Sequence, residues 1–330
     1  MARINSDLPS DRKRNVPRTI ALSTRKDINM NRWKALCAAA ALCAVCTPAL
    51  ATVNVFACLP EWAALATELG GDKVSVYQAS NALQDPHRIE ARPSLIAHMR
   101  SAELAICTGA ELEIGWLPVL LQTAGNQKVQ PGQPGFIAAA EFVDRLEIPT
   151  RLDRADGDVH PGGNPHIQLD PHNIAKVGLV ISQRLEQIDA GNATYYESRS
   201  KDFQGRWGQA ISRWEKDAAP LKGLRVVPYH KDSVYLIKWL GMVEVMNIEP
   251  KPGIPPSAGH LSDLVGRLKG GAADVIVRSA YQDSKSANSL SEKTTVPVVE
   301  LPYTVGGTTG AKDLFGLFDD SIARLKAVKK

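Results

Sequence analysis

The chain has 330 residues, with 39 Lys and Arg, 35 Asp and Glu, and a formal charge of +4. The first 51 residues hold nine of the basic and three of the acidic residues, so residues 52–330 keep 30 basic against 32 acidic ones and a net charge of −2. No basic block remains there to bind nucleic acid, and no apolar run remains that could span a membrane.

Residues 1–51 have the pattern of a leader that ends in a secretory signal peptide. Arg32 and Lys34 precede a twelve-residue apolar run, residues 35–46, and the small residues Ala49 and Ala51 follow with Leu50 between them. This order predicts cleavage near Ala51, with Met30 as an alternative start of translation. An uncleaved membrane anchor is the competing interpretation, although the apolar run is short for a span.

Short apolar runs alternate with helical patterns in residues 52–135. This alternation predicts a parallel α/β sheet. The expected strands are 52–58, 73–80 and 103–109, and the expected helices are 60–72, 92–102 and 115–125. Polar or Gly- and Pro-rich stretches at 125–135 and 153–165 are typical of loops.

Two helical stretches, 172–189 and 192–221, then precede a second alternation. Its expected strands are 224–230, 243–248, 273–279 and 296–302, and its helices are 231–241, 257–271, 286–295 and 311–329. The predicted fold is α/β, with two Rossmann-like lobes of parallel sheet joined by one long helix. We expect lobes at 52–189 and 221–330, each with its own core, and a linking helix at 190–220.

Two of the five cysteines, Cys58 and Cys107, lie in the exported part of the chain. Each ends an apolar run, and neighbouring parallel strands would bring both to the same edge of a sheet. A pair of cysteines in an oxidising compartment predicts a disulfide. Two free, half-buried thiols are the alternative.

Three histidines follow predicted strands or loops at places where a cleft between lobes would lie. They are His87, His166 and His230. Ligands of open α/β sheets bind beyond the carboxyl ends of the strands, so these side chains are candidates for one site. Three neutral imidazoles suit Zn²⁺ better than Mn²⁺ or Ca²⁺, which predicts a zinc site.

The other four histidines are expected outside this site. Asp170 and Pro171 have the pattern of a helix start, which places His172 at the surface in the first helical turn. His98 and His260 lie in helical patterns and are expected to be packing or surface residues. His160 lies in the polar loop and is expected to be solvated, with transient capture of a metal as the alternative.

From about residue 53 to 328, the chain resembles the periplasmic zinc- and manganese-binding proteins of metal ABC importers. The resemblance rests on five segments, "DPHRIEARPS", "AELAICTGAELEIGWLP", "HIQLDP", "YHKDSVYLIKWLG" and "IPPSAGHLSDL". It implies metal ligands at His87, His166 and His230, in a cleft between two lobes joined by a rigid long helix.

The resemblance also implies a transport function rather than catalysis. The expected protein is a periplasmic monomer that captures Zn²⁺ and passes it to the permease of an inner-membrane ABC importer. A zinc chaperone is a further candidate partner. Histidine in the third ligand segment resembles the zinc branch of the family, since manganese members tend to have a carboxylate there.

Two positions depart from the family pattern. The family has a fourth ligand, an Asp, after the last strand, where this chain has Pro302 and Tyr303. Glu300 is expected to point away, which leaves water, a loop group or Asp313 for the fourth position. Arg278 stands where the family often has an acidic residue.

Two other functions fit three histidines with an open fourth position. One is a carrier of Mn²⁺ or Fe²⁺ in the same family. The other is an exported zinc hydrolase, since catalytic zinc sites also have three protein ligands and an open position. The sequence has no HExxH motif and no carboxylate that its spacing would make a general base.

Overall fold

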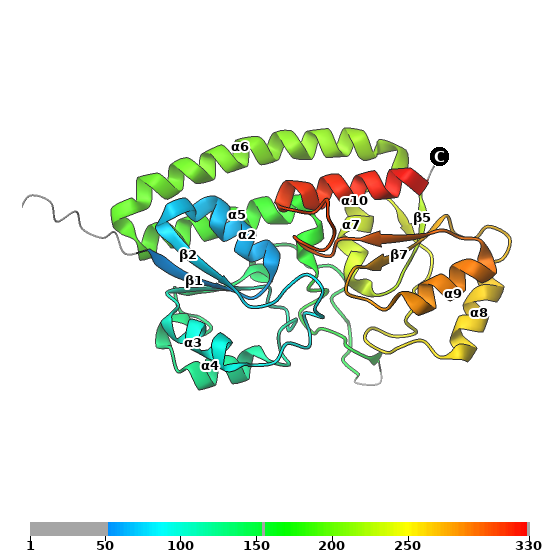
Figure 1. Ribbon diagram of the computed structural model, residues 1–330, viewed down its shortest axis with the longest axis horizontal. Coiled ribbons are helices and arrows are strands. Elements are labelled where there is room, and N and C mark those ends of the chain that lie inside the picture. The colour runs from blue at the N-terminus through cyan, green and yellow to red at the C-terminus, as the bar shows by residue number, and fades with distance from the viewer. Residues whose placement is uncertain (1–51, 154–155, 329–330) are drawn as a thin grey trace, which may run out of the picture. The chain divides into compact units, whose positions relative to one another are not determined.

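The computed structural model describes residues 52–153 and 156–328 (Figure 1). The described residues belong to one compact unit. The predicted leader and signal peptide lie outside the described residues. Among the helices that are described, none combines the length and the apolar character needed to cross a membrane.

The first lobe is built on a four-stranded parallel sheet with the strand order β2-β1-β3-β4. Its strands are β1 (Val53–Ala57), β2 (Val74–Gln78), β3 (Leu104–Cys107) and β4 (Phe136–Ala138). All four residues of β3 are buried, as expected of a strand covered by helices on both faces. The short strand β4 is absent from the predicted elements, because three residues show no periodicity.

Helices cover both faces of this sheet. Figure 1 shows α2 (Pro60–Gly70) and α5 (Pro171–Ile188) on one side and α3 (Pro93–Ser101) and α4 (Leu117–Ala124) on the other. All four have proline in the first turn, where its missing N–H leaves no hydrogen bond unmade. The Asp170 side chain accepts a hydrogen bond from the backbone N–H of His172 and caps α5, as predicted.

One long helix, α6 (Ala193–Ala218), follows the first lobe. Its 26 residues span about 39 Å. The helix packs on α2 and α5 of the first lobe and on α10 near the C-terminus. Its buried residues recur at helical spacing and are Tyr196, Ser200, Phe203, Trp207, Ala210, Trp214 and Ala218.

The second lobe repeats the topology of the first, with the strand order β6-β5-β7-β8. Its strands are β5 (Arg225–Pro228), β6 (Val243–Glu244), β7 (Val275–Ser279) and β8 (Val298–Leu301), all parallel. Its helices are α7 (Val234–Trp239), α8 (Ala258–Leu268), α9 (Ser284–Thr294) and α10 (Leu314–Val328). Two parallel sheets and a long helix confirm the predicted fold class.

The edge strand β6 is shorter than the predicted strand 243–248. It ends at Glu244, although the backbone N–H of Ile248 still donates to the carbonyl of Pro228 at 2.9 Å. The Asn247 side chain donates back to the Glu244 carboxylate at 2.7 Å. The chain therefore stays beside the sheet in an irregular conformation.

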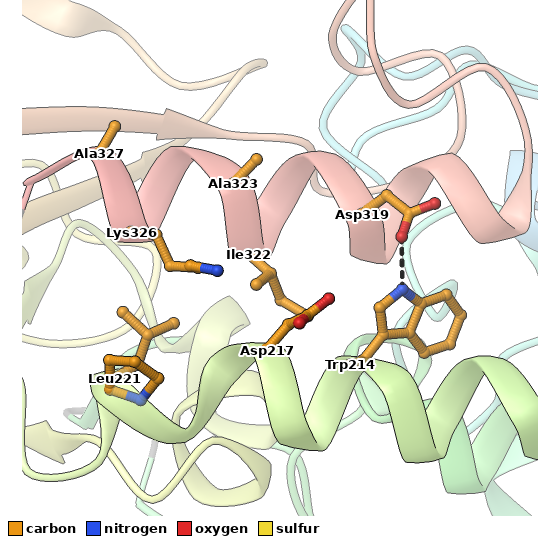
Figure 2. Close-up of a pocket in the computed structure, with 9 residues that line it drawn as sticks. Trp214, Asp217, Leu221, Asp319, Ile322, Ala323, Lys326 and Ala327 are labelled. Carbon is orange, nitrogen blue, oxygen red and sulfur yellow. Dashed lines mark hydrogen bonds between the residues drawn. The ribbon is translucent and has the colours of Figure 1, made fainter.

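The expectation of two separate cores is wrong. The largest apolar cluster runs from the first sheet through α6 and α10 into the second lobe, and only a smaller cluster lies apart. The rings of Trp207 and Trp214 on α6 contact that of Phe318 on α10, with centroids 5.6 and 5.0 Å apart. Figure 2 shows the Trp214 indole, which donates a hydrogen bond to Asp319 of α10 at 2.6 Å. The two lobes thus share a continuous packed interior.

A buried hydrogen bond also connects the lobes. The Thr304 hydroxyl, after β8, donates to the carboxyl group of Glu61 in α2 at 2.5 Å. Glu61 is fully buried, and burial raises its pKa to about 7, although the bond from Thr304 opposes that rise. Its other carboxyl oxygen has no hydrogen-bond partner in the described part of the chain. The acid is therefore largely neutral when the protein is folded below pH 7.

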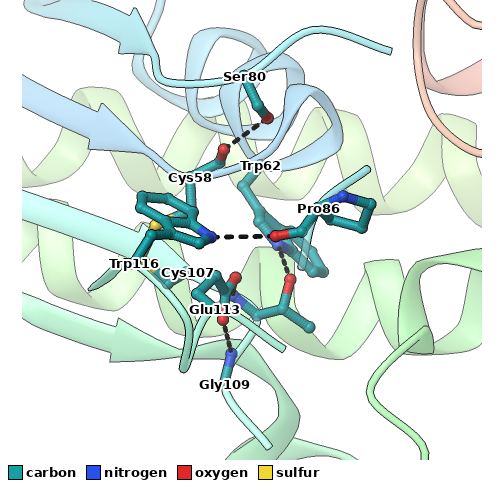
Figure 3. The surroundings of a disulfide bond; sticks show 9 residues. Cys58, Trp62, Ser80, Pro86, Cys107, Gly109, Glu113 and Trp116 are labelled. Carbon is teal, nitrogen blue, oxygen red and sulfur yellow. Dashed lines mark hydrogen bonds between the residues drawn. A yellow bond between two sulfur atoms is a disulfide. The ribbon is translucent and has the colours of Figure 1, made fainter. Parts of the chain in front are cut away.

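Cys58 and Cys107 form a disulfide, as predicted (Figure 3). Cys58 directly follows β1 and Cys107 is the last residue of β3, at the carboxyl edge of the first sheet, with Cα atoms 4.8 Å apart. The carbonyl of Cys58 accepts a hydrogen bond from the Ser80 hydroxyl at 2.8 Å. The disulfide thus lies beside the start of the loop that follows β2.

We predict that the double substitution Cys58→Ser/Cys107→Ser lowers the free energy of unfolding by about 2–4 kcal/mol, because the disulfide closes a long loop. Urea unfolding of residues 52–330 measures this loss. Adding a thiol reductant to the unsubstituted protein should give a similar loss. An unchanged free energy of unfolding in the double variant would contradict the prediction.

We predict that Glu61 makes stability depend on pH. Its folded pKa lies above its unfolded value of 4.5, so its contribution is complete below that value and is lost as pH rises through about 7. Raising pH from 5 to 8 should cost about 2–3 kcal/mol through this group. Glu61→Gln keeps an acceptor for Thr304 and should remove that part of the pH dependence in urea titrations. A variant with the same pH dependence as the unsubstituted protein would contradict this account.

Candidate metal centre

His87 lies in the loop that follows β2. Its backbone N–H donates to the Asp85 carboxylate at 3.0 Å, and its Nδ1 lies 2.8 Å from the same oxygen. The indole of Trp116 fixes the neighbouring carbonyl of Pro86 with a 3.0 Å hydrogen bond. The remaining nitrogen, Nε2, is buried and has no partner among the described residues.

His166 lies immediately before the short 3-10 helix Ile167–Leu169 that leads into α5. Its backbone N–H donates to the side-chain oxygen of Asn164 at 3.0 Å, which closes a tight turn. Its side chain is buried, and its Nδ1 lies 2.9 Å from the hydroxyl of Tyr303.

His230 follows β5 of the second lobe, where the strand leads toward a 3-10 turn. Its Nδ1 lies 2.6 Å from the carboxylate of Glu249, and the residue is 6% exposed. Glu249 itself also accepts from the backbone N–H of Gly253 at 2.9 Å, so the carboxylate is held from two sides.

The structure brings these three predicted histidines together. One ring nitrogen of each lies within 4.8 Å of the others, and the ring centroids are 5.4 to 5.8 Å apart. Each Nδ1 already has a partner, so Nε2 is the nitrogen that each ring can offer to an ion. The second such cluster among the described residues, Cys58, Cys107 and Glu113, has its two sulfurs joined in the disulfide.

Burial and neighbouring charges shift the pKa values of His166 and His230 in opposite directions. Burial first, and the neighbouring histidines second, place the pKa of His166 well below its usual value, so its ring is neutral. Burial also opposes charge on His230, but the bond to Glu249 and the charge of Asp232 outweigh it and raise the pKa. Asp85 and Glu249 add two negative charges beside the rings, which balances a divalent cation.

His160 is not a solvated loop residue, and the expectation that placed it in solvent is wrong. Its ring stacks on His87 with a centroid distance of 5.4 Å, and its Nε2 is buried without a partner among the described residues. Burial first, and the neighbouring His87 second, lower its pKa to about 4. The loop folds inward because the backbone N–H of Asp158 donates to the carbonyl of Pro252 at 2.8 Å.

Neither acidic candidate for a fourth ligand faces the histidines. Glu300 forms an ion pair with Arg278, so each of these two side chains neutralises the charge of the other. Asp313 accepts a hydrogen bond from the backbone of Gly316 at 2.7 Å and lines none of the described cavities around the three rings. The place of the expected Asp holds Tyr303, which contacts His166 instead.

The remaining histidines lie elsewhere. The His172 side chain is 49% exposed, with Nδ1 3.0 Å from Asp170. His98 stacks on Tyr77 with ring centroids 3.6 Å apart. The backbone N–H of His260 donates to the Ser257 hydroxyl at the start of α8. None of these three lines a described cavity beside the central histidines.

The cavities beside the histidines are small, and each is lined by both charged and uncharged residues. One of about 150 Å³ lies between the lobes and is lined by His160, His166 and His230, and Asp158 lines this cavity and the two next to it. A larger cavity of about 700 Å³ lies between α6 and α10 (Figure 2). Its lining contains no histidine or cysteine, and its Asp319 is already bonded to Trp214 and Arg213. Size therefore does not mark the metal site in this fold.

Sequence patterns did not identify the partners of the three rings. Asp85 lies two residues before His87 in the tripeptide Asp-Pro-His, which is a local signal. Glu249 and Tyr303 come from distant segments and reach His230 and His166 only through the fold. Nothing local in the sequence points to these two residues.

Comparison with known proteins identifies the family. The family model "ZnuA: Zinc-uptake complex component A periplasmic" matches residues 55–328. The chain is 25% identical over 195 residues to the high-affinity zinc uptake system protein ZnuA of Yersinia pestis, covering 56% of this chain and 61% of that protein. It is 24% identical over 318 residues to the corresponding protein of Paracoccus denitrificans, covering 86% of this chain and 94% of that protein.

Two solved structures share the fold. A crystal structure of ZnuA has a TM-score of 0.70 at 20% identity and covers 84% of this chain and 99% of its own. The substrate-binding protein FpvC of Pseudomonas aeruginosa, solved in complex with Mn²⁺, has a TM-score of 0.70 at 21% identity and covers 84% of this chain and 98% of its own. Because the family model spans nearly all the described residues, the chain belongs to the family of the periplasmic component A of zinc-uptake complexes.

Proposed function

We propose that this chain captures Zn²⁺ in the periplasm and delivers it to an ABC-type importer. The observation that carries the proposal is the convergence of one ring nitrogen each from His87, His166 and His230 within 4.8 Å. Each ring is held by a partner at its other nitrogen, an arrangement that proteins use to orient the imidazole ligands of metals.

The donor set favours zinc as the cargo. Imidazole nitrogen suits Zn²⁺, whereas Mn²⁺ is better served by carboxylate and carbonyl oxygen. The two carboxylates that contact Nδ1 of the central rings, Asp85 and Glu249, lie on the far side of those rings and supply charge rather than ligand atoms. Mn²⁺ or Fe²⁺ is the alternative cargo, since the P. aeruginosa relative with the same fold was solved in complex with Mn²⁺.

His160 supplies the fourth donor in this proposal. Its buried, unpartnered Nε2 and its stacking on His87 support this role. The low pKa of His160 keeps the ring neutral, as a metal ligand must be. A fourth protein donor closes the coordination sphere, which suits a carrier better than a hydrolase that needs an open position for water. The protein is therefore proposed to have no catalytic activity.

The remaining parts of the proposal concern export, the division into lobes and the partners of the protein. Residues 1–51 direct export and are removed near Ala51. Residues 52–189 and 221–330 act as lobes on either side of the linking segment 190–220. The partners are an inner-membrane permease and a zinc chaperone, the exported protein is a monomer, and nucleic acid is not a partner.

We predict that alanine at His87, His166 or His230 weakens zinc binding by more than about 100-fold, which exceeds the loss typical of an outer partner. Competitive titration of metal-free residues 52–330 with Zn²⁺ and a chromophoric chelator measures this. His172→Ala is the matched control, because His172 has the same local Asp-Pro-His setting at the surface, and it should bind zinc as the unsubstituted protein does. Equal losses in His172→Ala and His87→Ala would refute the assignment.

We predict a smaller loss, about tenfold, for His160→Ala, since three donors remain and water can take the fourth position. The same titration measures it, with His98→Ala as the control for loss of a stacked ring outside the site. If His160→Ala binds zinc as tightly as the unsubstituted protein does, His160 is not a ligand. The assignment of the other three histidines would not be affected.

A further inference from the structure

Tyr303 occupies an unusual place in this site. It follows β8, where the resemblance to the family implies a carboxylate ligand, and it is 2% exposed. Its hydroxyl lies 2.9 Å from Nδ1 of His166, and the two rings meet edge to face with centroids 5.6 Å apart. The tyrosine thus contacts the far side of the ring, away from the nitrogen proposed to bind the metal.

The position of Tyr303 is fixed from several directions. The Gln168 side chain donates to its backbone carbonyl at 3.3 Å, and the ring of Tyr281 packs against its own with centroids 5.3 Å apart. The next residue, Thr304, is hydrogen-bonded to Glu61 of the first lobe. A side chain held in this way can fix the orientation of the ring that it contacts.

The three rings differ in the chemistry of their partners. The carboxylates of Asp85 and Glu249 can only accept hydrogen bonds, so Nδ1 of His87 and of His230 must carry the proton. In the neutral form of each ring, Nε2 then has the lone pair. The Tyr303 hydroxyl, 2.9 Å from Nδ1 of His166, can either donate or accept a hydrogen bond.

We infer that Tyr303 is a positioning residue of the metal site that orients His166 and sets which of its ring nitrogens carries the proton. This inference rests on the proposed metal-binding function and deepens it. In the metal-free protein the phenol donates to Nδ1 of His166, because an imidazole nitrogen is a better acceptor than a phenol oxygen. The ring proton then lies on Nε2.

Metal binding reverses this arrangement. Nε2 of His166 gives up its proton, Nδ1 gains one, and the ring stays neutral. The hydroxyl of Tyr303 turns so that its oxygen accepts from Nδ1, and Nε2 presents its lone pair to the ion. His166 is therefore the one ring of the three that must exchange the positions of its proton and its lone pair, whereas His87 and His230 already hold a proton on Nδ1 toward a carboxylate.

The test uses residues 52–330 with Tyr303→Phe, which removes only the hydroxyl. Tyr196→Phe is the matched control, since Tyr196 is also buried and its hydroxyl donates to Asp189 at the end of α5. Ring nitrogens of ¹⁵N-labelled histidine are followed by long-range proton–nitrogen correlation spectra, with His166 assigned from a His166→Gln variant.

In the metal-free protein, we expect His166 to show a proton fixed on Nε2, and in Tyr303→Phe an average of the two proton positions. With Zn²⁺ as the probe, Tyr303→Phe should bind about tenfold more weakly, because a ring N–H polarised by the ion loses its acceptor. Tyr196→Phe should change neither the spectra nor the affinity.

Identical His166 ring spectra in the unsubstituted protein and in Tyr303→Phe, both without metal, would overturn the inference. So would a proton fixed on Nδ1 of His166 in the metal-free protein. Both outcomes are read without any metal, so they are independent of the cargo. Failure of the proposed function would appear separately, as weak zinc binding by the unsubstituted protein.

Discussion

The site depends on one repeated interaction, the hydrogen bond between Nδ1 of each central histidine and a fixed side chain. Asp85, Tyr303 and Glu249 hold the three rings so that each Nε2 faces the other two. Without these bonds, a ring could turn and place either nitrogen at the ion. The preorganised rings lower the entropic cost of binding a small cation between them.

The fold keeps those partners in place by joining the two lobes. An apolar cluster that runs through α6 and α10, the bond from Thr304 to Glu61 and the insertion of Tyr303 against His166 all connect one lobe to the other. Three central histidines from separate segments need such a frame, since a shift of one lobe would separate His230 from the other two. The shared interior thus helps to keep His230 close to His87 and His166.

Sequence reasoning located the strands other than β4, the α-helices and the three central histidines because these follow local rules. Apolar periodicity predicts the elements, and ligands collect at the carboxyl ends of parallel strands. The predicted strand 243–248 was longer than β6, because residues 245–248 lie beside the sheet in an irregular conformation. The prediction of two separate cores was wrong, because periodicity shows which face of α6 is apolar and does not show what that face packs against.

The tripeptide Asp-Pro-His illustrates the limit of local pattern. Its two copies form the same hydrogen bonds, from His N–H and Nδ1 to the aspartate, at 3.0 and 2.8 Å around His87 and at 2.9 and 3.0 Å around His172. Only burial separates the candidate ligand from the surface residue. His160 was misplaced for the related reason that its loop is folded inward by a contact with Pro252, which lies 92 residues beyond it in the chain.

The most direct test of the central claim is X-ray absorption at the zinc edge for residues 52–330 loaded with one equivalent of Zn²⁺. The account predicts a shell of imidazole nitrogens at about 2.0–2.1 Å, with the outer-ring scattering of at least three histidines. That scattering should fall by one histidine in His230→Ala. A shell dominated by carboxylate or water oxygen, unchanged in His230→Ala, would show that the ion binds elsewhere and would contradict the account.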